Sequence, residues 1–123
     1  MEKRILVVDD DMINLKMIDF ILSQKGYLVD KAASGMECLA KLEEQNYEYD
    51  LILLDVEMPE MNGVETLDKI REAEKGKQLK VCFLSAGNAQ EIQEDANRLA
   101  VAYYINKPIL PPELWDIVEK VLM

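Results

Sequence analysis

Histidine is absent from this chain of 123 residues, and cysteine occurs only twice, at Cys38 and Cys82. The two cysteines stand far apart, and no Cys-x-x-Cys motif is present. These absences exclude a zinc site built from cysteine and histidine. We predict that both cysteines are buried free thiols that pack as small core hydrophobes in a reducing compartment.

Long apolar runs and an excess of basic residues are also missing. No stretch approaches the roughly 20 apolar residues of a membrane-spanning helix, and the first residues lack the apolar core of a secretory signal. The formal net charge of −10 leaves no surplus of Lys and Arg to displace counterions from a phosphate backbone. We therefore expect a cytoplasmic protein that binds neither a membrane nor nucleic acid directly.

The size and composition favour one globular domain. Half of the residues are hydrophobic and 31% are charged, which is ordinary for a soluble domain. A chain of 123 residues is long enough for one core, and no repeat, low-complexity tract or linker interrupts it. We predict a single domain over residues 1–123.

Short β-branched runs alternate with longer amphipathic segments along the chain. Strands are predicted at residues 4–9, 27–32, 50–55, 79–85 and 102–106, and helices at 12–25, 35–46, 63–75, 89–99 and 111–122. Helix starts are indicated by Ser34 with Glu37, Asn62 with Glu65, Asn88 with Glu91, and Pro111 with Pro112. In the first helix Ile13, Met17, Phe20 and Ile21 recur at helical spacing, and Gly26 follows as a stop signal.

Five strands alternating with five helices predict an α/β fold with a parallel sheet covered on both faces. The runs at residues 5–8 and 51–54 are continuously apolar, as central strands of such a sheet should be. We take the flavodoxin-like, doubly wound order 2-1-3-4-5 from the general rule for these folds. The same rule places a ligand site between the carboxyl ends of the first and third strands.

Acidic residues stand at both of these strand ends. Asp9 and Asp10 follow the first strand, and Asp55 ends the third. Taken alone, each also suits a capping role at a helix or loop. Side by side, their like charges repel, and a divalent cation that prefers oxygen ligands relieves the repulsion. A few carboxylates with water favour Mg²⁺ over a Ca²⁺ cage that requires many ligands.

Two further polar residues end strands on the same rim of the predicted sheet. Lys107 follows the fifth strand, before Pro108, where a cis peptide bond is one option. Ser85 ends the fourth strand. Each also has an ordinary interpretation, as a surface lysine and a hydroxyl that caps a loop. Together with the acids, they suit phosphoryl transfer to a carboxylate, which needs positioning and neutralisation of charge.

The ordered set of these motifs resembles the response-regulator receiver domains of two-component signalling. The resemblance runs from Arg4 to the end of the chain. It rests on Val7-Val8-Asp9-Asp10, on Leu54-Asp55-Val56-Glu57-Met58-Pro59 with Met61 and Gly63, on Leu84-Ser85-Ala86, and on Lys107-Pro108.

The resemblance implies a role for each residue of the switch. Asp55 would be the phosphoacceptor, Lys107 would pair with the acid or the phosphoryl group, and Ser85 would be the switch hydroxyl. Tyr104 would be the switch aromatic, through which the fourth helix, fifth strand and fifth helix report phosphorylation. The resemblance implies a regulatory domain with slow self-dephosphorylation rather than an enzyme.

The resemblance also implies a metal site and partners. Asp10 and Asp55 would bind Mg²⁺, or Mn²⁺ in its place, with Asp9 acting through a water molecule and Glu57 through its backbone carbonyl. Since the chain lacks histidine, the donor histidine must lie on a histidine kinase or phosphotransfer protein. A downstream protein target or effector domain would read the switch, and the chain would be a monomer or a phosphorylation-linked dimer. We expect the side chain of Glu57 and the open edge at Gly87 to tune the lifetime of the phosphoryl group.

Three alternatives remain at this point. An aspartyl-phosphate phosphatase needs a second Asp two residues after the nucleophile, where this chain has Glu57. A flavin-binding module needs a loop that holds phosphate after the first strand, where three acids would repel it. Within the receiver interpretation, the chain is either a stand-alone switch, which we favour, or a module of a larger kinase or effector protein.

Overall fold

The structure, a computed structural model, describes residues 2–87 and 89–123. Within them, five parallel strands form one sheet in the order β2-β1-β3-β4-β5, which confirms the predicted fold and strand order. The strands are β1 (Arg4–Val8), β2 (Leu28–Ala32), β3 (Leu51–Asp55), β4 (Val81–Ser85) and β5 (Tyr103–Asn106). The α-helices are α1 (Met12–Ser23), α2 (Gly35–Glu44), α3 (Gly63–Glu72), α4 (Ala89–Arg98) and α5 (Pro111–Leu122), and a 3-10 turn (Glu74–Gly76) follows α3.

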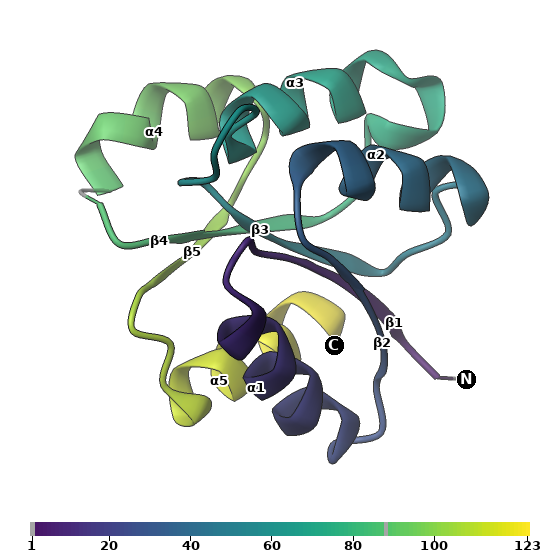
Figure 1. Cartoon of the computed structure of the whole chain (residues 1–123), viewed down its shortest axis with the longest axis vertical. Helices are drawn as coiled ribbons and strands as arrows, with labels where there is room; N and C mark the ends of the chain where they lie inside the picture. The colour runs from purple at the N-terminus through teal and green to yellow at the C-terminus, as the bar shows by residue number, and fades with distance from the viewer. Residues whose placement is uncertain (1, 88) are drawn as a thin grey trace.

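Helices cover both faces of the sheet. Figure 1 shows α2, α3 and α4 on one face and α1 and α5 on the other. Every residue of β3 and β4 is buried, which explains the continuous apolar run at residues 51–54. Cys38 packs in the core on the side of α2, and Cys82 packs in the core on the side of α1. Both are buried free thiols, as predicted, and burial raises the pKa of each to about 12.

Two of the predicted helix starts have the expected capping contacts. The hydroxyl of Ser34 accepts a hydrogen bond from the backbone N–H of Glu37 at 3.1 Å. Asn62 and Glu65 form a reciprocal capping box at the start of α3. The start predicted at Asn88 lies outside the described residues. None of the helices in the described ranges is long and apolar enough to cross a membrane.

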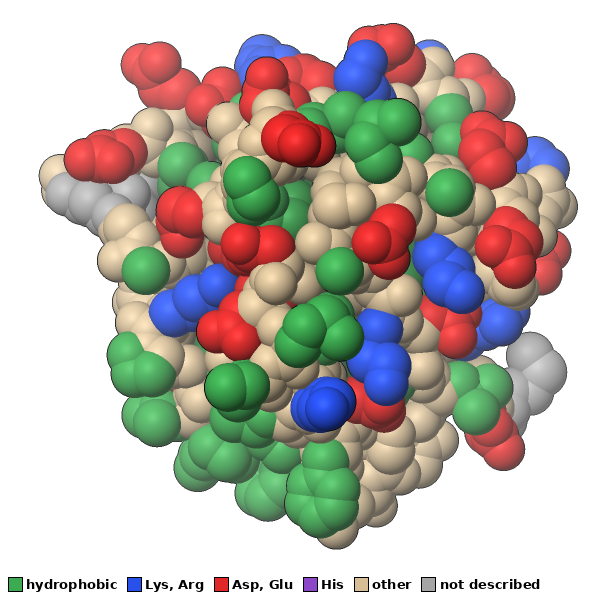
Figure 2. All heavy atoms as spheres, in the orientation of Figure 1, with side chains coloured by type: hydrophobic (Ala, Val, Ile, Leu, Met, Phe, Trp, Pro, Cys, Tyr) green, Lys and Arg blue, Asp and Glu red, His purple; other side chains and the backbone are tan. Residues whose placement is uncertain are grey.

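The first helix differs from the prediction in its end and in the face that it buries. It ends at Ser23, and Gly26, with φ of 89°, lies in the turn that follows. Ile13 and Phe20 are 78% and 65% exposed, whereas Ile21 is buried, so the apolar spacing identified the helix but only part of its buried face. The buried residues are Leu15, Ile18, Ile21 and Leu22. Figure 2 shows hydrophobic side chains exposed on the α1 and α5 side of the molecule.

The carboxyl end of α4 is tied to α3. Arg98 forms ion pairs with Asp68 of α3 at 2.6 Å and with Asp95 of its own helix at 3.1 Å. Nε of Arg71 donates to the carbonyl of Leu99 at 3.0 Å. The Arg98 pairs are exposed and contribute little to stability, whereas the partly buried Arg71 contact fixes the backbone where α4 ends.

Candidate functional site

The carboxylates of Asp9 and Asp55 lie together because their strands are paired. In the parallel pairing of β1 with β3, Val8 is opposite Leu54, so the next residues reach the same edge of the sheet. Oxygen atoms of Asp9, Asp10 and Asp55 lie within 4.8 Å of one another. Asp9 and Asp55 are fully buried, whereas Asp10 is exposed. The structure thus brings together three acids that the sequence pattern places at strand ends.

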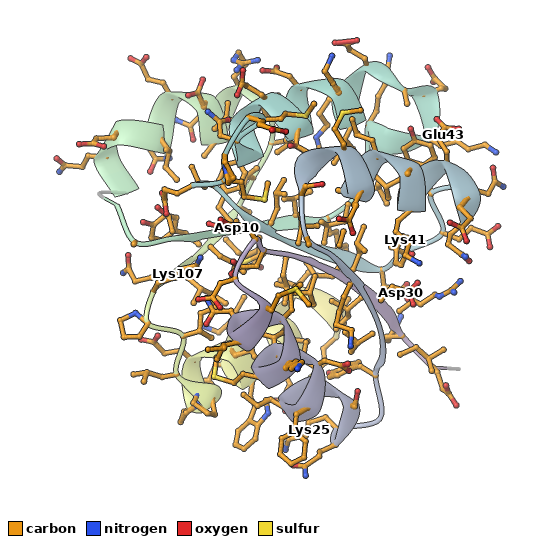
Figure 3. All side chains as sticks on the ribbon, viewed as in Figure 1. Asp10, Lys25, Asp30, Lys41, Glu43 and Lys107 are labelled. Carbon is orange, nitrogen blue, oxygen red and sulfur yellow. The ribbon has the colours of Figure 1, made fainter. Side chains whose placement is uncertain are left out.

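Lys107 reaches this group from the end of β5. Its backbone N–H donates to the carbonyl of Ser85 at 2.8 Å, and its peptide bond to Pro108 is cis. Nζ lies 3.0 Å from Oδ2 of Asp9 and 3.0 Å from Oδ2 of Asp55. Figure 3 shows Asp10 and Lys107 on the same edge of the sheet, although they follow different strands. The ammonium group of Lys107 therefore faces two buried carboxylates.

Burial dominates the electrostatics of Asp55. It raises the pKa of this carboxyl to about 7; the charge of Asp9 adds to the effect, and contact with Lys107 opposes it. Burial lowers the pKa of Lys107, but the close contacts of its ammonium group with the carboxylates of Asp9 and Asp55 outweigh burial and leave this pKa above its ordinary value. The ammonium group is therefore charged at neutral pH, while Asp55 gives up its proton only near pH 7.

The oxygens of Asp9 and Asp55 differ in their hydrogen bonds. Oδ1 of Asp9 accepts from the backbone N–H of Asp11 at 2.9 Å, and Oδ2 accepts from the side chain of Asn14 at 3.2 Å. Oδ1 of Asp55 accepts from the backbone N–H of Glu57 at 3.1 Å. Its Oδ2 is buried and accepts no aligned hydrogen bond from the described residues. Lys107 is close to this oxygen but is not directed at it in hydrogen-bond geometry, so the contact is a charge interaction.

The donor set fits a small divalent cation. Three carboxylates converge on one place, and a buried oxygen of Asp55 is left without a directed partner. Hard cations such as Mg²⁺ bind such oxygens and tolerate water in the remaining positions. The exposed Asp10 leaves the site open to solvent on one side.

A second group of contacts connects the site to the loop after β4. Oε2 of Glu57 accepts a hydrogen bond from the hydroxyl of Ser85, and Oε1 accepts from the backbone N–H of Ala86 at 2.8 Å. The hydroxyl of Ser85 also accepts from the N–H of Gly87 at 3.0 Å, and the Tyr104 hydroxyl donates to the carbonyl of Gly87 at 2.9 Å. The sequence analysis expected the side chain of Glu57 to act near the phosphoryl group, but it did not predict these contacts with Ser85 and Ala86.

Gly63 is the residue that permits the close approach of α3 to the site. A Cβ atom at this position would lie 2.3 Å from the carbonyl oxygen of Asp55. The N–H of Gly63 donates to the carbonyl of Val56 at 2.9 Å. The sequence offered only a weak signal for this packing, a glycine directly after the capping residue Asn62.

Comparison with known proteins identifies a single family. The model of the response regulator receiver domain matches residues 5–119. The chain is 36% identical over 120 residues to chemotaxis protein CheY of Treponema pallidum, covering 97% of this chain and 82% of that protein. A solved structure of chemotaxis protein CheY4 of Vibrio cholerae is similar with a TM-score of 0.91 and 30% identity, covering 99% of this chain and 100% of that chain.

Relatives of very different length contain this sequence pattern. The chain is 36% identical over 121 residues to hybrid signal transduction histidine kinase L of Dictyostelium discoideum, covering 95% of this chain but 7% of that protein. The similarity therefore extends both to a protein of comparable size and to one domain of a much larger protein.

Proposed function

Because the chain belongs to the family of response regulator receiver domains, we propose that it is a phosphorylation-activated switch whose phosphoacceptor is Asp55. The observation that carries the proposal is the buried carboxylate of Asp55. One of its oxygens accepts no hydrogen bond from the described residues and lies beside Lys107 and two further acids. A nucleophilic carboxylate needs such an oxygen, and phosphoryl transfer needs nearby positive charge.

In the proposed reaction, an ionised oxygen of Asp55 attacks phosphorus. An O–P bond forms while the bond from phosphorus to the donor breaks, and its electron pair leaves with the imidazole nitrogen of a phosphohistidine or the carboxylate oxygen of an acyl phosphate. Lys107 would balance charge on the phosphoryl oxygens from its position next to Asp9 and Asp55. Ser85 would donate its hydroxyl proton in a hydrogen bond to one of those oxygens.

The group of three acids and the family resemblance together support a proposed set of metal ligands. Asp10, Asp55 and the backbone carbonyl of Glu57 would bind Mg²⁺ directly, and Asp9 would act through a water molecule. When bound, the cation supplies positive charge that offsets both the repulsion between the acids and the charge of the phosphoryl group. Asp9 also has an organising role, since its oxygens accept from Asp11 and Asn14.

The partners of the proposed switch are proteins. The family implies a histidine kinase or a phosphotransfer protein as donor, and the chain itself has no histidine. We propose that Tyr104 couples the site to the face formed by α4, β5 and α5, because its hydroxyl contacts the loop that follows Ser85. A protein target or an effector domain would bind this face. We propose that residues 1–123 act as one receiver domain, either alone or within a longer protein.

Mass spectrometry of the intact protein tests the proposal. After incubation with acetyl phosphate and Mg²⁺, we expect one phosphoryl group on the wild-type protein, none without Mg²⁺, and none on Asp55→Ala. Asp116→Ala, which removes an exposed acid of α5, should be modified like the wild type. Equal modification of Asp55→Ala would refute the assignment, and catalytic turnover of p-nitrophenyl phosphate would indicate a phosphatase instead.

A further inference from the structure

The side chain of Glu57 occupies two hydrogen-bond donors at the edge of the site. Its two carboxylate oxygens accept from the Ser85 hydroxyl and the Ala86 backbone N–H. Two oxygens of one anionic group bound by a hydroxyl and a backbone amide form the arrangement expected for a phosphoryl group. Ser85 is 1% exposed, so its hydroxyl has little access to water while Glu57 is in place.

We propose that the Glu57 carboxylate is an internal competitor of the phosphoryl group. It binds the donors at Ser85 and Ala86 in the unphosphorylated protein and must leave them when Asp55 is phosphorylated. The proposal rests on the proposed function, because it takes Asp55 as the phosphoacceptor. It gives a physical basis for the expectation that the side chain of Glu57 tunes the phosphoryl group.

The position of Glu57 makes this competition unavoidable once Asp55 is modified. Its backbone N–H donates to Oδ1 of Asp55 at 3.1 Å, so the residue starts beside the phosphoacceptor. Its side chain then extends to the end of β4, where Leu84 is the strand partner of Asp55. A phosphoryl group on Asp55 and the Glu57 carboxylate would therefore be two anions competing for the same donors, at a distance where their charges repel.

The same contacts explain how release of Glu57 reaches the surface. The Ser85 hydroxyl that donates to Glu57 also accepts from the N–H of Gly87 at 3.0 Å. The carbonyl of Gly87 in turn accepts from the Tyr104 hydroxyl at 2.9 Å. When the Ser85 hydroxyl turns from Glu57 to a new acceptor, its hydrogen bond with the N–H of Gly87 is disturbed. Release of Glu57 is thus the step that allows the hydrogen bond between the Tyr104 hydroxyl and the Gly87 carbonyl to change.

Titration with beryllofluoride, a mimic of the phosphoryl group, tests the proposal at saturating Mg²⁺. Glu57→Ala removes the carboxylate and leaves the backbone carbonyl in place. We expect it to bind beryllofluoride about tenfold more tightly than the wild type, the effect of losing one charged hydrogen-bond competitor. Glu57→Asp keeps the charge but shortens the side chain by one methylene group. Its affinity for beryllofluoride should therefore be closer to that of Glu57→Ala than to that of the wild type. Glu60→Ala, an exposed acid in the same loop, should change affinity less than about twofold.

Nuclear magnetic resonance of the unliganded protein tests the contact itself. We expect the Ala86 amide proton to move upfield in Glu57→Ala and in Glu57→Asp, because it loses an anionic acceptor, and to stay unchanged in Glu60→Ala. Equal affinity of wild type and Glu57→Ala, or wild-type affinity of Glu57→Asp, would overturn the proposal while leaving the proposed function intact. Failure of the wild type and Glu57→Ala alike to bind beryllofluoride would overturn both.

Discussion

Replacement of Asp55 by Asn should stabilise the protein when divalent cations are absent, and the gain should grow with pH. Burial raises the pKa of Asp55 from 3.8 to about 7 in the folded protein. In the unfolded chain the carboxyl titrates near its ordinary pKa. Between these two values the folded state binds the additional proton, so the contribution of this group to the free energy of unfolding falls as the pH rises. Asn has the same shape and no charge, and it escapes this loss.

The magnitude follows from the size of the pKa shift. One unit corresponds to about 1.4 kcal/mol. Of the pH interval between 3.8 and about 7, roughly one pH unit lies below pH 5 and roughly two lie between pH 5 and pH 7. The advantage of Asp55→Asn over the wild type should therefore grow by roughly 2–3 kcal/mol from about pH 5 to about pH 8. For a domain of this size the change corresponds to a difference in Tm on the order of 10 °C.

Thermal unfolding in EDTA at the two pH values measures this difference. Asp116→Asn, which removes an exposed charge on α5, serves as the control and should shift Tm little and equally at both pH values. Addition of Mg²⁺ should raise the Tm of the wild type more than that of Asp55→Asn, since the cation binds the charged carboxyl. A wild-type Tm that equals that of Asp55→Asn near pH 8 in EDTA would refute the reasoning.

Two substitutions test packing around the site. Gly63→Ala places a Cβ atom 2.3 Å from the carbonyl oxygen of Asp55. We expect the free energy of unfolding in urea to fall by about 1–3 kcal/mol and Mg²⁺ to bind more weakly. The control is Gly87→Ala, whose Cβ atom would have its nearest contact at 3.4 Å, and equal effects of the two substitutions would contradict the argument from close approach. Arg71→Lys should lower the free energy of unfolding by about 2 kcal/mol in the same assay, because the guanidinium group of Arg71 donates to three backbone carbonyls. A stability equal to that of the wild type would show that one ammonium group suffices. These carbonyls belong to Leu99, Gly76 and Leu79.

The features that could be predicted from the sequence depend on residues close together along the chain. The apolar run before Asp55 predicts a buried strand, and the meeting of Asp9 with Asp55 follows once the general rule for the fold pairs the first strand with the third. The pairing of Asn62 with Glu65 is local as well, and the capping box is present. These predictions need no knowledge of side-chain directions across the fold.

The missed features depend on contacts between distant segments. The contact of Glu57 with Ser85 joins residues 28 positions apart and depends on the direction in which one flexible side chain turns. In α1, apolar residues occur on more than one side, and only packing against the sheet selects Leu15 and Ile18 over Ile13 and Phe20. The clearance at Gly63 likewise arises only when α3 approaches β3.

The attachment of α4 has a mechanical consequence. The contact of Arg71 with the backbone of Leu99 fixes its carboxyl end beside α3, while its other end joins the loop that contains Gly87. A helix held at one end pivots there, so its displacement increases with distance from that end. A rearrangement of the loop should tilt this helix about the Arg98 end, and a binding partner that touches its first turn would register a larger movement than one that touches its last.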